Sequence, residues 1–290
     1  MSWFILALLS PLFWGIENLL YKVSARKRHN SDLVGIIFLG AALAGCLVMQ
    51  VVTRAVWTQI PLTVGICLVY SLCYLLVIQS RFEALKHVDV NFFFPVTKVG
   101  SLIILIVFAL LVRHDSLTLI QGAGLLTACL TIYLLGTGSA GTDKTRRSAR
   151  GILFTLLCTL STGTAFILVS YASAAGGNSQ FMVLGNLFTL ILSLLMWHTR
   201  RPVVTKPPVQ HQTQGLWLTG ISIGLFNITG GFLYLEAIRL GNFSLVNGLN
   251  NLALLVTIAC TLILPAYREP FGRRKIAGTV LAFLSIFLMR

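Results

Sequence analysis

Charged residues are scarce in this chain, and acidic residues are the scarcest of them. Of 290 residues only 10% are charged and only 8 are Asp or Glu, whereas 56% are hydrophobic. A water-soluble domain carries charge on roughly a quarter of its residues, so an ordinary soluble fold is excluded. The mean hydropathy of +0.87 indicates an integral membrane protein.

The sequence also lacks the patterns that build metal centres, disulfides and catalytic sites. Its 6 cysteines lie singly in apolar stretches without a C-x-x-C spacing, and its 5 histidines fall in or beside loops or at the end of a span. No nucleophile with a base is found at membrane depth, and there is no nucleotide-binding P-loop. We therefore expect no enzyme activity, no catalytic or metal-binding residues and no cofactor.

What the chain does contain is a series of apolar runs of about 18 to 22 residues. As an α-helix each is long enough to cross a hydrocarbon core of roughly 30 Å. The N-terminus has no basic region and no small-residue cleavage site, so it is predicted to be the first span and not a removable signal. We predict an all-α membrane protein with about ten spans, at residues 2–22, 33–53, 62–80, 90–112, 117–136, 151–171, 180–198, 216–238, 244–265 and 274–289.

The basic residues predict how the chain is oriented. The net charge is +14, but Lys and Arg lie almost wholly between the apolar runs, which is typical of topology signals and not of nucleic-acid binding. One side carries most of them: Lys22, Arg26, Lys27, Arg28, Arg81, Lys86, Lys144, Arg146, Arg147, Arg150, Arg200, Arg201, Lys206, Arg268, Arg273, Arg274 and Lys275. The other side carries Arg54, Arg113, Arg239 and Arg290. The positive-inside rule places the first side in the cytoplasm and both termini outside it.

A long segment of the first half returns in the second half. Residues 81–135 and 235–288 share one plan: a charged junction, a long apolar helix, a short polar turn and a second apolar helix. The loops that correspond between the halves differ in charge, so they are expected on opposite sides of the membrane, as inverted-topology repeats require. We predict one five-span repeat at residues 1–140, a basic linker at 141–150 and a second five-span repeat at 151–290.

These features carry a resemblance to a known family. The residues that carry it are Trp14-Gly15 followed by Lys22, the junctions E-A-L-K at 83–86 and E-A-I-R at 236–239, Pro95, and R-H-D-S-L-T at 113–118. Together with the five-plus-five arrangement they resemble the EamA-type members of the drug/metabolite transporter superfamily. The resemblance implies ten helices in two inverted repeats, a central polar cavity that opens alternately to either side, and transport of a small metabolite. It also implies a multi-pass protein of the bacterial inner membrane, with lipid and the substrate as its partners.

Two ionisable residues inside spans are the first candidates for the transport site. Charged side chains are costly in a membrane and usually face a cavity or a partner. Glu17 in the first span and Lys98 in the fourth are expected within about 3 Å of each other in depth, at a rise of 1.5 Å per residue. They form either a substrate site, suited to a zwitterion such as an amino acid, or a structural salt bridge between two helices.

Polar and aromatic residues at similar depth complete the predicted substrate site. In the first half they are Trp14, Asn18, Tyr21, Tyr70, Tyr74 and Thr97, and in the second half Asn227, Asn247, Asn250 and Asn251. Their alternative role is packing between helices, with one hydrogen bond each. Pro95, Gly230 and Gly231 are candidate hinges or helix interruptions, with close packing as the alternative. Gly220 and Gly224 form a G-x-x-x-G motif.

The sequence thus predicts a secondary transporter that moves a small polar metabolite by alternating access, with proton coupling through Glu17 as one option. An amino acid or an amine is the favoured cargo. The first alternative is a phosphorylated or lipid-linked metabolite, such as a nucleotide sugar, with Lys98 as the phosphate partner. The alternative of another class is a membrane scaffold that transports nothing, which would tolerate neutralisation of both Glu17 and Lys98. The sequence predicts no oligomeric state.

Overall fold

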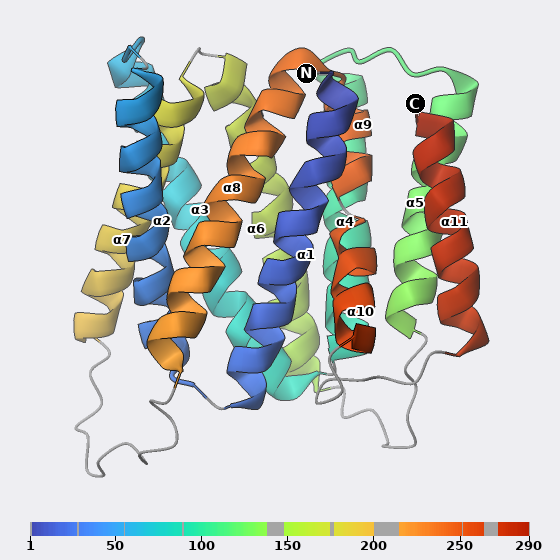
Figure 1. Cartoon of the computed structure of the whole chain (residues 1–290), viewed down its shortest axis with the longest axis horizontal. Helices are drawn as coiled ribbons and strands as arrows, with labels where there is room; N and C mark the ends of the chain where they lie inside the picture. The colour runs from blue at the N-terminus through green and yellow to red at the C-terminus, as the bar shows by residue number, and fades with distance from the viewer. Residues whose placement is uncertain are drawn as a thin grey trace.

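A computed structural model describes residues 2–27, 29–54, 56–88, 90–137, 148–174, 177–199, 215–250, 252–263 and 272–289. The regular structure within these ranges is helical throughout (Figure 1). The helices in chain order are α1 (Trp3–Arg26), α2 (Ser31–Thr53), α3 (Ile60–His87), α4 (Val90–Leu111), α5 (Leu119–Thr137), α6 (Ala149–Ala174), α7 (Asn178–Thr199), α8 (Leu216–Leu240), α9 (Phe243–Asn250), α10 (Ala253–Ile263) and α11 (Arg273–Met289).

The predicted membrane fold is confirmed. In the described part of the chain, 8 segments are long and apolar enough to cross a membrane, and the shorter apolar stretches Leu119–Leu135 and Ile276–Met289 lie in α5 and α11. Large apolar side chains are exposed along the outer faces of the bundle, as contact with lipid requires. The chain is a multi-pass integral membrane protein.

The helices of the two halves pack against one another in reciprocal pairs. α1 packs along α8, and α3 packs along α6; α2 contacts α7 and α8, and α5 lies beside α11 (Figure 1). Both termini lie at the same end of the bundle. Reciprocal pairing is what a two-fold relation between the halves predicts. The limits of the repeats at residues 140 and 150 stay a prediction, because residues 141–147 lie outside the described ranges.

Close packing between α8 and α2 depends on the two glycines of the G-x-x-x-G motif. A Cβ atom on Gly224 would lie 2.5 Å from the backbone oxygen of Phe38, and one on Gly220 would lie 2.6 Å from Ile37 Cγ2. Distances this short are steric clashes, so only glycine allows the two backbones to approach. The motif therefore forms a helix-packing surface of the kind that small residues provide in membranes.

The predicted ninth span is not one continuous helix. It consists of α9 and α10, which are separate on either side of residues 251–252. Asn and Gly are poor helix formers, and α9 ends in the run Asn247, Gly248, Leu249, Asn250. Gly248 also faces α5 and α11, where a Cβ would lie 2.5 Å from Leu125 Cδ2. α4 and α8 run unbroken through Pro95, Gly230 and Gly231, the candidate hinges or interruptions.

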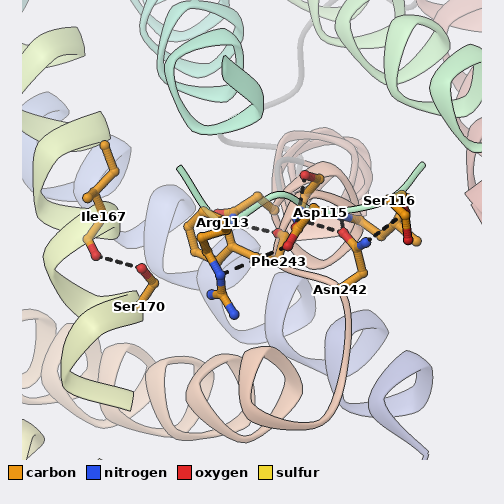
Figure 2. A network of polar contacts seen from close by, with 10 residues as sticks. Arg113, Asp115, Ser116, Ile167, Ser170, Asn242 and Phe243 are labelled. Atoms are coloured by element: carbon orange, nitrogen blue, oxygen red, sulfur yellow. Dashed lines mark hydrogen bonds and ion pairs between the residues drawn. The ribbon is translucent and has the colours of Figure 1, made fainter. Parts of the chain in front are cut away.

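The start of α9 is held by the connection between α4 and α5 (Figure 2). Asp115 Oδ2 accepts hydrogen bonds from the backbone nitrogen and the hydroxyl of Ser244, both at 3.2 Å. Asn242 Oδ1 accepts from Ser244 N at 3.0 Å, while Asn242 Nδ2 donates to the Ser116 carbonyl at 3.3 Å. The guanidinium of Arg113 lies 5.1 Å from the ring centre of Phe243. Side chains from both halves thus cap one short buried helix.

The two charged junctions form ion pairs at opposite ends of the bundle. In the second, Arg239 Nη2 lies 2.7 Å from Glu236 Oε2, an i, i+3 pair on α8. In the first, Glu83 Oε1 lies 3.0 Å from Arg150 Nη2 on α6 and 3.4 Å from His87 Nε2. The side chain of Lys86, in the same junction, lies outside the described part of the structure. Glu83 therefore joins α3 to α6.

Candidate functional site

A cavity of about 140 Å³ lies inside the bundle, between α1, α3, α4, α6, α7 and α8. A single bound water needs about 10–15 Å³ of such space, so the cavity has room for several waters or for a small molecule. Charged and polar side chains and a larger apolar area share its wall. This combination of an apolar enclosure with a few polar groups is typical of a small-molecule site.

The helices that contribute several residues to the cavity wall do so from one face each. The polar and charged members of the lining are Glu17, Asn18, Tyr70, Tyr74, Arg81, Lys98, Thr162, Asn186, Asn227 and Tyr234. The apolar members are Trp14, Val77, Ala165, Phe166, Val169, Phe181, Met182, Gly185, Gly231 and Leu235. Positions three, four or seven apart recur on α1, α3, α6 and α8, which is the periodicity of a single helix face.

The carboxylate of Glu17 is held from the opposite half of the chain. Asn227 Nδ2 on α8 donates to Glu17 Oε1 at 3.1 Å and to Oε2 at 3.2 Å, and it lies 3.4 Å from the Tyr74 hydroxyl. Glu17 is only 6% exposed. A buried carboxylate requires hydrogen bonds or opposite charge, and Asn227 supplies part of that requirement.

Two cations share the cavity with this carboxylate. Arg81 on α3 and Lys98 on α4 both line it and both lie within electrostatic range of Glu17. Within the described residues no direct ion pair joins Glu17 to Lys98. The side chain that contacts the Glu17 carboxylate is instead the amide of Asn227. The guanidinium of Arg81 lies 5.2 Å from the ring centre of Tyr21, a cation–π contact. One acidic and two basic groups therefore face the same enclosed space.

Two groups of aromatic rings form the remaining walls. Trp14, Phe166 and Tyr234 contact one another, with ring centres 5.3 to 5.8 Å apart. Tyr70 and Tyr74 are stacked at 5.5 Å, and Tyr70 meets Phe181 edge to face at 4.9 Å. Rings packed at these separations hold each other in place. The cavity thus has rigid apolar walls beside its charged groups.

The structure brings together many of the residues predicted for the substrate site. Those that line the cavity are Trp14, Glu17, Asn18, Tyr70, Tyr74, Lys98 and Asn227. They come from four helices and from both halves of the chain, as the expected depth of Glu17 and Lys98 implied. Their role in binding a substrate stays a prediction.

Two predicted residues of the first half lie behind this wall. Tyr21 is buried between Phe38 and Phe82, and its ring makes the cation–π contact with Arg81. Thr97 is buried beside Lys98 on α4, and its hydroxyl has no hydrogen-bond partner among the described residues. The interior of this bundle is thicker than one layer of side chains, so depth in the membrane alone does not place a residue on the cavity wall.

The asparagines of the ninth span lie between helices and not on the cavity wall. Asn247 Oδ1 accepts from the Tyr234 hydroxyl at 2.9 Å, and Asn247 Nδ2 donates to the Phe243 carbonyl at 2.8 Å. Asn250 Oδ1 accepts from Ser10 Oγ at 3.0 Å. These amides form hydrogen bonds between α9 and its neighbouring helices. This is the helix-packing role that the sequence offered as the alternative to substrate binding. Asn251 lies outside the described residues.

Arg81, Asn186 and Tyr234 are lining residues that sequence analysis missed. Arg81 was assigned to a basic loop because the span was ended at residue 80, whereas α3 continues to His87. The signal was present: Tyr70, Tyr74, Val77 and Arg81 follow one helix face at intervals of four, three and four residues. For Asn186 the signal was a single amide in an apolar span. Tyr234 had no signal that separates it from a packed core tyrosine.

The arrangement offers binding chemistry and no centre for bond making. No group of three or more His, Cys, Asp or Glu in the described ranges is close enough to hold a metal ion. The charged side chains of the cavity are a carboxylate, a guanidinium and an ammonium, which recognise ions and dipoles of opposite sign. The cavity can therefore bind a small molecule that carries charge.

Comparisons with known proteins agree with this fold. Residues 149–290 match the EamA-like transporter family. No curated protein matches the chain in sequence. A solved structure described only as "Crystal structure of protein" is similar with a TM-score of 0.75 and 15% identity, over 97% of this chain and 95% of that chain. At this identity the likeness shows the fold alone.

The family match covers the second half of the chain, and the structural likeness extends the same fold over nearly all of it. Both agree with the membrane-spanning bundle and its internal cavity. The protein is therefore a secondary transporter of a small molecule and not an enzyme. Residues 149–290 are therefore a domain of the EamA-like transporter family.

Proposed function

We propose that this protein transports an amino acid, or a small zwitterion of similar size, by alternating access between the two halves of the bundle. The observation that carries the proposal is that Glu17, Arg81 and Lys98 line one cavity. A zwitterion can present its ammonium group to Glu17 and its carboxylate to the two cations. A guanidinium binds a carboxylate in a planar, two-pronged geometry, and Lys98 adds a second positive charge.

The charges of the cavity favour a zwitterion over a simple amine. An amine would satisfy Glu17 but would leave Arg81 and Lys98 without an anion, and uncompensated buried charges are costly. An amino acid offers one group of each sign. The amide of Asn227 already donates to both oxygens of Glu17, so the ammonium group of the substrate would share this carboxylate with it.

The size of the cavity also limits the cargo. A cavity of about 140 Å³ suits a metabolite of amino-acid size. A nucleotide sugar or a lipid-linked sugar is much larger, and its apolar or nucleotide part would have to remain outside the enclosed space. These larger molecules are therefore less compatible with the cavity than an amino acid is.

A small phosphorylated or carboxylated anion is the second candidate. The specific observation in its favour is the excess of positive charge, since Arg81 and Lys98 face a single carboxylate. If Glu17 carries a proton, two cations remain for a dianion such as a phosphate. Proton exchange at Glu17 would then couple proton movement to transport of either substrate class.

A thermal-shift screen of the detergent-purified protein tests the proposal, because a ligand that binds the folded state raises its melting temperature. The ligands are amino acids, amines and small sugar phosphates, applied to the wild type, Glu17→Gln, Arg81→Met and Lys98→Met. We expect amino acids to stabilise the wild type and to lose about tenfold or more in affinity with each variant. Stabilisation by sugar phosphates alone, retained in Glu17→Gln, would replace the first candidate by the second.

Uptake into proteoliposomes tests the coupling. A ligand found in the screen is supplied with and without an imposed pH gradient, at equal substrate concentrations. We expect the gradient to drive accumulation in the wild type and not in Glu17→Gln. Equal uptake with and without the gradient in the wild type would mean facilitated diffusion.

A further inference from the structure

Two adjacent glycines of α8 face different surroundings. A Cβ on Gly230 would lie 2.7 Å from Trp14 Cδ1 and 2.8 Å from Trp14 Nε1, which is a clash. A Cβ on Gly231 would meet only Met182 Cε, at an ordinary contact distance of 3.5 Å. Gly230 is therefore required for packing against α1, whereas Gly231 has room for a side chain.

The free space at Gly231 belongs to the cavity. Gly231 lines it, and so does Met182, the one side chain that an added Cβ would approach. Glycine in a helix interior is unfavourable compared with alanine. The packing of α8 does not require a glycine at position 231. Any other residue there would fill part of the cavity.

Gly231 also occupies a middle position along the cavity. Asn227 lies one helical turn before it and holds Glu17, and Tyr234 and Leu235 lie about one turn after it among the aromatic walls. Along α8, position 231 thus lies between the residue that holds Glu17 and the aromatic ring of Tyr234. A substrate whose charged end binds near Glu17 would pass its side chain beside this glycine.

We propose that Gly231 sets the size limit for the apolar part of the substrate. The inference rests on the proposed function, because it assumes that the charged end of the substrate binds at Glu17, Arg81 and Lys98. A methyl group at position 231 narrows the passage toward Met182 without touching the charged groups. Met182 is unbranched and flexible, so it yields to small side chains and limits large ones.

The test compares ligand size ranges in Gly231→Ala, Gly231→Val and the wild type, measured by thermal-shift titration of the purified protein. Two series of increasing size serve as probes: alanine, valine, leucine, phenylalanine and tryptophan, and methyl, butyl and phenyl phosphate. One methylene in a close-fitting apolar pocket changes affinity by roughly 10- to 200-fold. We expect Gly231→Ala to weaken the largest accepted ligand by about tenfold or more and the smallest by less than about threefold, and Gly231→Val to lower the limit further.

Gly65→Ala is the matched control. Gly65 lies on α3 with nothing within 4 Å of an added Cβ, and it does not line the cavity. The control therefore gains the same methyl group and the same helix propensity outside the cavity, and it should keep the full ligand range of the wild type. Gly231→Ala should melt at or above the wild-type temperature.

The outcomes separate the size role from the proposed function. If one series binds the wild type and Gly231→Ala accepts the same range as Gly65→Ala, the size role is wrong and the proposed function remains. A Gly231→Ala protein that fails to fold would contradict the open space and overturn the inference. If neither series stabilises the wild type, the cavity is not the binding site and both proposals fail.

Discussion

The carboxylate of Asp115, in the connection between α4 and α5, caps the first turn of α9 through Ser244 (Figure 2). The two residues are far apart in the sequence and come from different halves of the chain. The Ser244 N–H is shared between Asp115 and Asn242 Oδ1, at the start of a helix that is buried along its whole length. A negative charge at a helix N-terminus is also favourable to the helix dipole.

Replacement of Asp115 should therefore destabilise the protein. Loss of a capping side chain costs about 0.5–2 kcal/mol, so we expect Asp115→Ala to lower the free energy of unfolding by about that amount. Thermal unfolding in detergent measures the change. Ser116→Ala, which keeps the carbonyl that accepts from Asn242, is the control and should unfold near the wild-type temperature. Equal melting of both variants would mean that the cap contributes nothing.

The contact between Asn227 and Glu17 should show strong coupling. Asn227→Leu removes the donor of two hydrogen bonds and leaves a buried carboxylate without it, a cost of about 1–3 kcal/mol or more for a charged group. In Glu17→Gln this cost should be smaller, because the uncharged amide requires less compensation. Thermal unfolding of both single variants and the double variant gives the coupling energy. Additive effects of the two substitutions would contradict the contact.

The starts of the spans were predictable because lipid demands long apolar helices, and that demand is local. Every predicted span starts within about three residues of the start of a helix, which is the usual uncertainty of element boundaries. The break between α9 and α10 was not predicted. Asn247 and Asn250 beside it accept hydrogen bonds from Tyr234 and Ser10, which lie on other helices, and such contacts cannot be read from the local sequence.

Two of the charged residues of the candidate site could be predicted from the sequence, but the complete set of residues that line the cavity could not. Glu17 and Lys98 are conspicuous because ionisable residues are rare inside spans. Arg81 was missed because a basic residue near the end of an apolar run is normally a topology signal. Here Tyr21 packs under its guanidinium and the cavity lies beside it, and neither contact can be inferred from spacing alone.

The glycine surface between α8 and α2 should be intolerant of side chains. Gly224→Val would place its Cβ 2.5 Å from the Phe38 carbonyl oxygen and push the helices apart. Overpacking of this kind costs about 1–3 kcal/mol or more. We expect a lower melting temperature or loss of folded protein by size-exclusion chromatography. Gly35→Val on α2 is the control, since nothing lies within 4 Å of its added Cβ.

The ion pair between Glu83 and Arg150 should contribute little despite its short distance. The Arg150 side chain is 65% exposed, and exposed pairs are worth at most about 1 kcal/mol because water and salt screen them. Arg150→Ala should therefore lower the melting temperature only slightly, and Arg239→Ala, which breaks the other junction pair, should behave alike. A large loss of stability in either variant would instead assign that pair a major structural role.

Both termini are predicted to lie outside the cytoplasm. They lie at one end of the bundle (Figure 1), and the end of α1 and the starts of α6 and α11, with Lys27, Arg150, Arg273 and Arg274, lie at the other end. Retention of Lys and Arg on the cytoplasmic side is the strongest known determinant of orientation. A membrane-impermeant maleimide should therefore label Ser2→Cys in intact cells and label Ala149→Cys only after permeabilisation, with the wild-type protein as the background for the native cysteines. Labelling of Ala149→Cys in intact cells, with Ser2→Cys protected, would reverse the orientation and place the basic end of the bundle outside.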